Sequence, residues 1–218
     1  MKQESLLDRL SPDDRKAVIQ SSMRRKYRAG ETVFHEGDPG RTMHLIVKGR
    51  VIIYVVTRQG DNAAVAVLRP GQCFGELSMF GSGLRSASVV ALESLETFTI
   101  QHERLGDDRW AQVVQRYLVE SLAEQVGRLT TRVLDAHFAT AEQRVVRRLS
   151  EAVRLFADPP EEEVDVLNIT QQQLADLAGT TRPTVNRVLK DHELDGTISL
   201  GRGRIHIEDL ARLDRLAR

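Results

Sequence analysis

The stretch ITQQQLADLAGTTRPTVNRVLK, residues 169–190, decides the fold of the C-terminal part of the chain. Its first half predicts a short helix over 171–177. Thr170 suits a helix cap, and Gln173, three residues later, completes a capping box in which each side chain bonds the other's backbone N–H. Gly179 follows the last apolar residues, where glycine ends a helix because it adopts the left-handed conformation without strain.

The second half of the stretch predicts a helix over 182–193. Thr180 or Thr181 caps it, and Pro183 stands in its first turn, where the missing N–H of proline costs nothing. Two short helices joined by a glycine turn are typical of a helix-turn-helix, whose second helix enters the major groove of DNA. Apolar residues at helical spacing predict the buried face of the pair: Leu174, Leu177, Val185, Val188 and Leu189.

The exposed side chains of this motif are basic or polar. Arg182 and Arg187 are expected to read bases, because a guanidinium pairs bidentately with guanine. Asn186 is expected on the same exposed surface of the second helix. Contacts to phosphates are expected from Thr170, Gln171, Thr184 and Lys190.

A hairpin follows the motif. Thr197–Leu200 and Arg204–Ile207 bracket a tight turn at 201–203, as in a wing that brings Arg202 and Arg204 to the DNA backbone. The alternative is a helical hairpin with solvated arginines, which periodicity alone does not exclude. The glycine turn, the two caps and the trailing hairpin together favour DNA binding.

Residues 23–103 have a different character. Short β-rich runs alternate with glycine-containing turns at intervals of about 8–12 residues, a spacing typical of a β-sandwich or barrel. The expected strands include Thr32–His35, Thr42–Val47, Arg50–Thr57, Ala63–Leu68, Ser86–Ala91 and Leu95–Ile100.

Residues 108–136 predict one long helix, because they contain no proline and a single glycine, Gly127. Apolar residues with charged flanks favour a parallel dimer of these helices. The alternative is a helix packed on its own β-sandwich. The apolar residues alternate at spacings of three and four and form an a/d seam: Val119, Leu122, Val126, Leu129, Val133 and Ala136.

Two further helix starts are visible. Ser11-Pro12 lies within a predicted N-terminal helix over 5–22 and suits a cap followed by a first-turn proline. Thr140 and Gln143 form a second capping box, which opens a helix over 141–156. The chain therefore breaks at His137–Ala139, the expected hinge between domains.

Composition narrows the class of protein. The 218 residues carry no net charge and include one cysteine, Cys73, so no intramolecular disulfide can form. The six histidines show no metal-ligand spacing, and we expect no metal, haem or iron–sulfur cluster. The longest apolar stretches are strand-sized, and the N-terminus has no signal-peptide core. A soluble cytoplasmic protein without a membrane partner is expected.

Four segments together resemble the cyclic-AMP receptor protein/FNR family of bacterial transcription factors. They are MHLIVKGRVIIYV (43–55), RPGQCFGELSMF (69–80), RSAS (85–88) and the helix-turn-helix quoted above, and the resemblance covers essentially the whole chain.

The resemblance implies an α+β fold in three parts. These are an N-terminal cyclic-nucleotide-binding β jelly roll (1–107), a long dimerisation helix and hinge (108–138) and a C-terminal winged helix-turn-helix (139–218). It also implies a homodimer bound to double-stranded, pseudo-palindromic promoter DNA, with RNA polymerase as a further partner.

The resemblance places an effector site in the jelly roll, with cyclic AMP as the expected effector. Glu76 would accept from the ribose 2′-hydroxyl, and Arg85 with Ser86 would hold the cyclic phosphate, which suits a guanidinium fork. The alternative is a structural ion pair between Glu76 and Arg85 in a member that has lost its ligand. The same turn, whose backbone N–H groups can cradle an anion, contains Gly75, Leu77 and Ser78.

Two positions depart from the family pattern. Cyclic-AMP-responsive relatives carry a Thr-Ser pair on the long helix that contacts adenine across the dimer. An ungapped alignment places Leu129-Thr130 there, and a shift by one residue places Thr130-Thr131 there; a leucine would remove one base-specific contact. Pro183 stands where many relatives have a glutamate that accepts from cytosine, so base preference at that position is expected to differ.

Several other interpretations stay open at this point. Cys73 is expected to be a buried apolar residue, with a redox sensor as the alternative. A ligand-gated regulator has three rivals: a regulator with an empty pocket, an enzyme acting on cyclic nucleotides, and a pure dimerisation module. The enzyme lacks a clustered metal site or a nucleophile–base pair, and the dimerisation module leaves Arg182 and Arg187 without a purpose.

Overall fold

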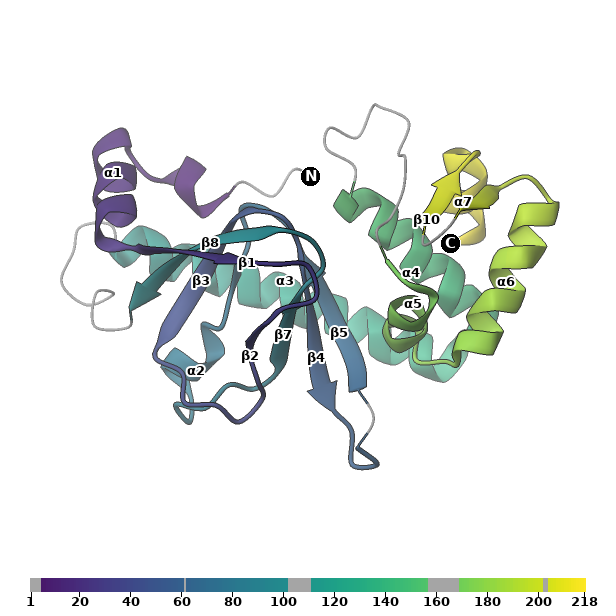
Figure 1. Cartoon of the computed structure of the whole chain (residues 1–218), viewed down its shortest axis with the longest axis horizontal. Coiled ribbons are helices and arrows are strands. Elements are labelled where there is room, and N and C mark those ends of the chain that lie inside the picture. The colour runs from purple at the N-terminus through teal and green to yellow at the C-terminus, as the bar shows by residue number, and fades with distance from the viewer. Residues whose placement is uncertain (1–4, 61, 102–110, 157–168, 202–203) are drawn as a thin grey trace. The chain divides into compact units, whose positions relative to one another are not determined.

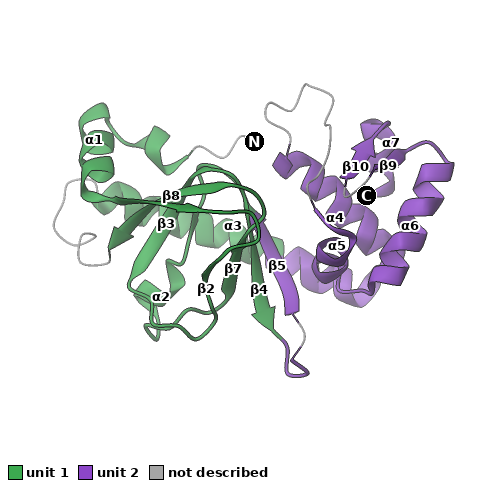
Figure 2. Ribbon diagram, viewed as in Figure 1, with its two compact units in different colours: residues 1–56, 68–128 green, residues 57–67, 129–218 purple. Residues whose placement is uncertain are grey.

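The computed structural model describes residues 5–60, 62–101, 111–156, 169–201 and 204–218. The chain forms two compact units (Figure 2): residues 1–56 with 68–128, and residues 57–67 with 129–218. The first unit is mainly β and the second mainly helical (Figure 1). The long helix α3, Ala111–Phe138, contributes residues to both units.

The strands that precede α3 form two four-stranded sheets, with the orders β1-β8-β3-β6 and β2-β7-β4-β5. Apart from the consecutive strands β4 and β5, neighbours in these sheets are distant in sequence, as in a jelly roll. Strand β8 pairs antiparallel with both β1 and β3. The strands are β1 (Met23–Tyr27), β2 (Thr32–Phe34), β3 (Thr42–Lys48), β4 (Val51–Val56), β5 (Asn62–Leu68), β6 (Cys73–Phe74), β7 (Ser88–Ala91) and β8 (Leu95–Gln101).

One core cluster joins the N-terminal helices, the β1-β8-β3-β6 sheet and the first turns of α3. Tyr117 of α3 is fully buried there, and its hydroxyl donates to the carbonyl of Gly71 at 3.0 Å. The cluster fixes the start of α3 on the first unit. Its buried members are Leu6, Leu10, Val18, Met43, Leu45, Cys73, Met79, Ile100, Val114, Tyr117 and Leu118.

The prediction of a single N-terminal helix over 5–22 is wrong. The structure has a short 3-10 helix, η1 (Leu6–Arg9), followed by α1 (Pro12–Ser21). Ser11 separates them, because its hydroxyl caps α1 by accepting from the Asp14 N–H at 3.1 Å. A residue before proline is also biased towards extended backbone, which prevents a continuous helix through Ser11.

The second unit contains the two predicted capping boxes. The Thr140 N–H donates to Gln143 Oε1 at 2.9 Å, and the Gln143 N–H donates to Thr140 Oγ1 at 3.2 Å. Thr170 and Gln173 are bonded in the same way before α5. The elements are α4 (Ala141–Phe156), α5 (Gln171–Ala178), α6 (Arg182–Leu194), β9 (Ile198–Gly201), β10 (Arg204–Ile207) and α7 (Leu210–Leu216).

The predicted turn between α5 and α6 is also confirmed. Gly179 ends α5 with a φ of 58°, in the left-handed region. Thr181, rather than Thr180, caps α6 by accepting from the Thr184 N–H, and Pro183 stands in its first turn. Both helices turn their apolar residues inward, and the predicted face that includes Leu174 and Val185 is buried.

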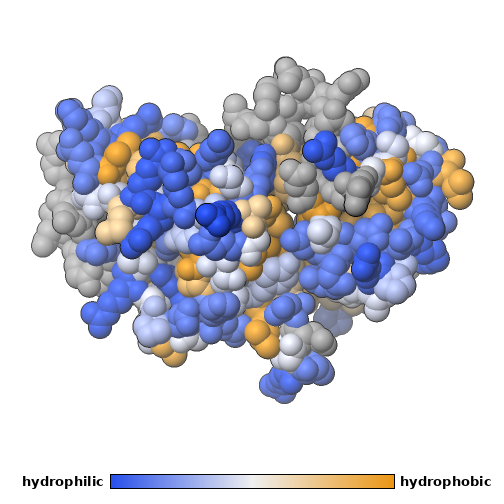
Figure 3. Space-filling model, viewed as in Figure 1, coloured by the Kyte–Doolittle hydropathy of each residue, from blue (hydrophilic) through white to orange (hydrophobic). Residues whose placement is uncertain are grey.

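Some elements were not expected from the sequence: β1, β6, the short helix α2 (Leu77–Phe80) and α7. On the face shown in Figure 3, hydrophilic residues cover most of the surface and hydrophobic ones form scattered patches. Among the described residues, none of the helices is long and apolar enough to cross a membrane.

Candidate functional site

Arg85, between α2 and β7, is held by a cradle of backbone and side-chain acceptors. It is only 6% exposed. Its Nη1 donates to the carbonyls of Thr42 and Gly75, both at 2.7 Å, and to Ser78 Oγ at 2.9 Å. Its Nη2 donates to Thr42 Oγ1 at 2.9 Å, and the guanidinium lies 4.1 Å from the ring centroid of Phe34. These contacts fix the position of a buried positive charge.

Two glycines make room for this arginine. A Cβ atom on Gly75 would lie 2.6 Å from Arg85 Nη1, and one on Gly40 would lie 2.5 Å from Arg85 Nε. Gly75 also has a φ of 82°, which favours glycine. Gly40 and Gly75 therefore allow the backbone to approach Arg85 more closely than a residue with a side chain would.

Two buried polar atoms of this site have no hydrogen-bond partner: Arg85 Nε and Glu76 Oε2. Glu76 is itself 8% exposed, and burial raises the pKa of its carboxyl group. Burial likewise lowers the pKa of the Arg85 guanidinium. The two side chains, both within the described part of the chain, form no ion pair, which counts against a structural salt bridge between Glu76 and Arg85. The site offers one hydrogen-bond acceptor and one cationic donor.

A second layer of buried groups lies behind these two. The ring of His44 stacks on Phe74 at 4.9 Å, and its Nδ1 lies 3.2 Å from Thr97 Oγ1. Burial, and then the charge of Arg85, lower the pKa of His44 to about 3, so the ring is neutral. Cys73 is buried and its thiol pKa is raised by burial, which disfavours the reactive thiolate. No group of three metal-binding side chains occurs in the part of the chain that the structure describes.

The remaining residues expected at this site differ in exposure. Ser78 is buried, Gly75 is half-buried, and Leu77 and Ser86 are exposed. Thr130 and Thr131 are exposed on α3, in the part of that helix that belongs to the second unit. The structure therefore brings Gly75, Glu76, Ser78 and Arg85 together; the roles of Thr130 and Thr131 stay predictions.

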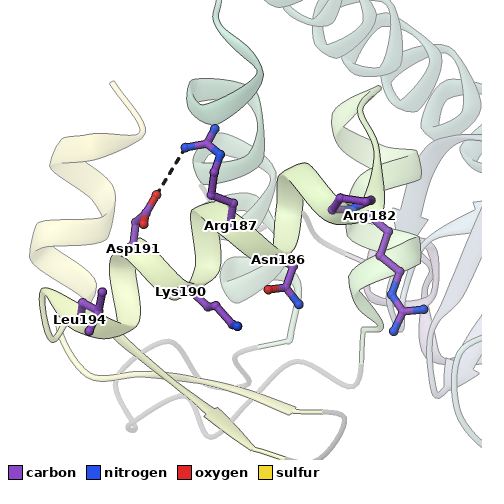
Figure 4. A pocket seen from close by; sticks show the side chains of 7 residues that line it. Arg182, Asn186, Arg187, Lys190, Asp191 and Leu194 are labelled. Atoms are coloured by element: carbon purple, nitrogen blue, oxygen red, sulfur yellow. Dashed lines mark hydrogen bonds and ion pairs between the residues drawn. The ribbon is translucent and has the colours of Figure 1, made fainter.

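The second candidate site is the exposed face of α6. An open depression follows this face and is lined by residues from Arg182 to Leu194. In Figure 4, Arg182, Asn186 and Lys190 point to one side of the helix, as their spacing of four residues requires. Arg187 points to the other side, where it pairs with Asp191 at 3.4 Å.

One hydrogen bond joins this face to α5. Asn186 Nδ2 donates to Gln171 Oε1 at 3.3 Å. Thr170 and Thr184 are engaged locally, since the Thr170 hydroxyl caps α5 and the Thr184 hydroxyl lies 3.0 Å from that of Thr181. Arg202, expected on the wing, lies outside the described residues.

The predicted seam of α3 is largely exposed in the single chain. Val119, Val126 and Val133 are 66%, 64% and 56% exposed, and Leu129 is 42% exposed. The face of α3 that does pack on the β-sheets is a different one, with Val114, Tyr117 and Leu118 buried. Within the first unit, Val119 and Val126 therefore do not pack on the β-sandwich.

Comparison with known proteins decides the family. Residues 24–107 match the model of the cyclic nucleotide-binding domain, and residues 143–216 match that of the Crp-like helix-turn-helix domain. The chain is 31% identical, over its full 218 residues and 98% of the relative, to the cyclic AMP receptor protein of Thermus thermophilus. The chain belongs to the cyclic-AMP receptor protein/FNR family. It is a transcription regulator of that family, with a cyclic-nucleotide-binding domain and a helix-turn-helix domain.

Another relative and two solved structures are similar to this chain in sequence or in fold. A CRP-like cAMP-activated global transcriptional regulator of Mycobacterium tuberculosis is 30% identical over 87% of this chain and 85% of its own length. The crystal structure of the Thermus thermophilus catabolite activator protein covers 97% of both chains, at 31% identity and a TM-score of 0.54. The regulator CLP of Xanthomonas campestris shares the fold, with a TM-score of 0.78 at 22% identity over 90% of this chain and 99% of that one.

Sequence reasoning missed several residues of both sites. Three residues that surround Arg85 lie more than 40 positions before it in the sequence. They are Phe34 on β2, Thr42 on β3 and Gly40 in the loop between these strands. Nothing in their local pattern pointed to Arg85. Asp191 was missed although its position four residues after Arg187 on a helix is a recognisable pairing signal.

Proposed function

We propose that this chain is a homodimeric DNA-binding transcription regulator whose affinity for DNA is controlled by cyclic AMP or a related cyclic nucleotide. The effector domain spans 1–107, the dimerisation helix and hinge 108–138, and the DNA-binding domain 139–218. The observation that carries the proposal is the pair of buried atoms without partners, Glu76 Oε2 and Arg85 Nε. Buried polar groups are almost always paired, so an incomplete pair points to a ligand that completes it.

A cyclic nucleotide fits this pair of groups. A ribose hydroxyl can donate to Glu76 Oε2, and a phosphate oxygen can accept from Arg85 Nε in a charge-assisted bond. Ser86, whose side chain is exposed beside Arg85, supplies a further hydroxyl for the phosphate. Gly75, Leu77 and Ser78 belong to the same turn, in which Gly75 makes room for the guanidinium of Arg85. The proposal includes no catalysis by the chain and no metal, haem or iron–sulfur cofactor.

Recognition of the adenine is assigned to Thr130 and Thr131 on α3, both exposed, which would contact the base across the dimer. Their hydroxyl groups can pair with the polar edge of the base, and a site built this way loses discrimination when the hydroxyl is removed. Replacing each with alanine should reduce the preference for cyclic AMP over cyclic GMP without abolishing binding, since the phosphate and ribose contacts remain.

Calorimetric titration of cyclic AMP into the purified protein tests the effector. Binding is expected in the wild type and is expected to be lost in Arg85→Met. A matched control is Arg50→Met, because Arg50 belongs to the same domain but pairs with Glu93 at 2.7 Å. Cyclic GMP and cyclic di-GMP serve as competitors. The alternative function, an effector-independent regulator, predicts no binding of any of these and unchanged DNA affinity.

The dimer is assigned to the a/d seam of α3: Val119, Leu122, Val126, Leu129, Val133 and Ala136. Exposed apolar residues at heptad spacing support this assignment, because such a seam is normally covered by a second helix. Sedimentation analysis is expected to show a dimer for the wild type and a monomer for Val126→Lys combined with Val133→Lys. The control is Leu134→Lys, since Leu134 is 54% exposed, like Val133 at 56%, but lies outside the seam.

DNA contact is assigned to Arg182 and Arg187 for bases and to Thr170, Gln171, Thr184, Lys190 and Arg202 for phosphates. In the dimer the two α6 helices would meet half-sites one DNA turn apart, roughly 34–36 Å. Replacing both arginines with alanine should abolish retention of DNA in a mobility-shift measurement. RNA polymerase is a proposed further partner at the promoter, and the cytoplasm is the proposed location.

A further inference from the structure

Asn186 occupies the middle of the exposed face of α6. Arg182 lies one turn before it and Lys190 one turn after it, and in Figure 4 the three side chains point the same way. All three line the depression along the helix. A helix that enters the major groove with this face presents Asn186 to base edges, between two cations that attract the negatively charged DNA.

The amide group of Asn186 is oriented by α5. Its Nδ2 donates one hydrogen to Gln171 Oε1 at 3.3 Å. Gln171 is the first residue of α5, after the Thr170 cap, so its own position is set by the capping box. An asparagine amide has two N–H donors and one carbonyl acceptor. After the bond to Gln171, Asn186 retains one N–H donor and its Oδ1 acceptor for a base.

These two remaining groups match the major-groove edge of adenine. Adenine presents N7 as an acceptor beside the N6 amino group as a donor, and asparagine pairs with both at once. Guanine presents two acceptors, N7 and O6, so Oδ1 of an amide held in this orientation would face O6 without a hydrogen between them. The bond from Gln171 therefore favours adenine over guanine by fixing which end of the amide faces which base atom.

We propose that Asn186, oriented by Gln171, reads one adenine in each half-site. The inference rests on the proposed DNA-binding function and specifies one base of each half-site that the protein recognises. Arg187, which is proposed to contact a base of its own, pairs with Asp191 on the flank of the helix and would have to leave that exposed pair to do so. Pro183 offers no side-chain hydrogen-bonding group, so Asn186 supplies discrimination that the second residue of α6 cannot.

The test is selection of binding sequences from random double-stranded DNA by the full-length protein, with cyclic AMP present. The wild type is expected to enrich adenine at one position of each half-site. Asn186→Ala should flatten that position by about 10-fold or more while leaving the other positions unchanged. Asn186→Asp should shift the preference to cytosine, because a carboxylate accepts from the N4 amino group.

Variants of Gln171 test the positioning role separately. Gln171→Ala removes the acceptor and should weaken the preference of adenine over guanine without changing the unfolding temperature appreciably. Gln171→Glu keeps an acceptor for the same N–H and should restore the preference, even where its charge lowers overall affinity for DNA. A purely structural bond between α5 and α6 would change the unfolding temperature and leave the base profile alone.

The outcomes distinguish this inference from the function on which it rests. DNA binding with an unchanged base profile in Asn186→Ala overturns the inference and leaves the proposed function standing. A profile that Gln171→Ala does not alter overturns the positioning role. If the wild type selects no sequence with or without cyclic AMP, the proposed function fails and the reading of adenine fails with it.

Discussion

Arg85 and Arg148 are buried to a similar degree, 6% and 4% exposed, but their surroundings are opposite. Arg148 of α4 pairs with Asp135 near the end of α3 and with both carboxylate oxygens of Glu151 at 2.6 Å. Asp135 also pairs with Arg147. Arg85 instead has only uncharged acceptors, and its Nε and the nearby Glu76 Oε2 remain without partners.

The difference separates a charge that is paired within the chain from one whose pairing is incomplete, and it supports the ligand site proposed above. A buried charge is tolerated when it is paired and hydrogen-bonded, and it is costly otherwise. The group around Arg148 completes its pairs within the chain and joins α3 to α4 next to the hinge. The group around Arg85 is incomplete, and a molecule that carries both a hydroxyl and an anion would complete it.

The largest loss of unfolding free energy is expected for a variant that breaks the ion pairs around Arg148. Asp135→Ala removes the carboxylate that Arg147 and Arg148 share and leaves the buried Arg148 with only the partly exposed Glu151, so it should lower the free energy of unfolding by about 3 kcal/mol. Urea denaturation followed by circular dichroism measures this. The control is Glu124→Ala, which removes an exposed pair with Arg128 on the same helix and should cost about 0.3–0.5 kcal/mol. Equal losses in the two variants would contradict the structural role of Asp135.

Arg85→Met should produce the reverse pattern. The change removes a buried cation whose pairing is incomplete, so its loss of unfolding free energy should stay well below that of Asp135→Ala. Affinity for cyclic AMP should fall by about 100-fold or more, because a charge-assisted contact to phosphate is lost. Calorimetry and urea denaturation on the same preparation provide both values. A variant that unfolds readily and still binds the nucleotide would refute the comparison.

His44 is a buried titratable group that stays uncharged in the folded protein at neutral pH. Its pKa is lowered to about 3 in the folded chain, while the unfolded chain titrates near the ordinary value of 6.5. Below pH 6.5 the unfolded state therefore binds a proton that the folded state does not, and stability falls as the pH is lowered. Between pH 7 and pH 5 this contributes a loss of about 2 kcal/mol. His44→Phe should remove that part of the pH dependence; an unchanged slope would show that His44 is not its source.

Glu76 should give the smallest effect, a pH dependence of binding. Burial raises the pKa of its carboxyl group in the free protein, and a donating hydroxyl favours the ionised form. Nucleotide affinity should then fall on acidification through that raised pKa, by at most about 10-fold per pH unit, and level off at higher pH. Glu76→Gln should bind more weakly with a flatter profile. An identical profile in both proteins would remove Glu76 from the binding site.

The helix-turn-helix was predictable in detail because the residues that cap and end its helices are close together in sequence. The Thr170–Gln173 capping box, the left-handed Gly179 and the Thr181 cap each depend on residues a few positions apart. β1 was missed because its sequence, MRRKY, is charged and lacks apolar alternation. It forms because β8 supplies a partner strand, on which Glu96 pairs with Arg24 and Lys26.

The buried charges were harder to predict, because their partners come from distant segments. Thr42 lies 43 residues before the arginine that it holds, and Asp135 reaches Arg148 across the hinge. One signal was present in the second case. Arg148 falls on the apolar face of α4 with Val145, Leu149 and Ala152, all buried, and an arginine at such a position requires a buried acid.

The central claim is that a ligand completes the hydrogen bonding around Arg85 and Glu76 and thereby changes the affinity of the protein for DNA. Fluorescence anisotropy of a labelled DNA site, titrated with the protein at fixed ionic strength with and without cyclic AMP, tests it most directly. The account predicts that cyclic AMP tightens binding by about 10-fold or more in the wild type, within the usual range of allosteric coupling, and has no effect in Arg85→Met. Equal DNA affinity of the wild type with and without a saturating concentration of the nucleotide would contradict it.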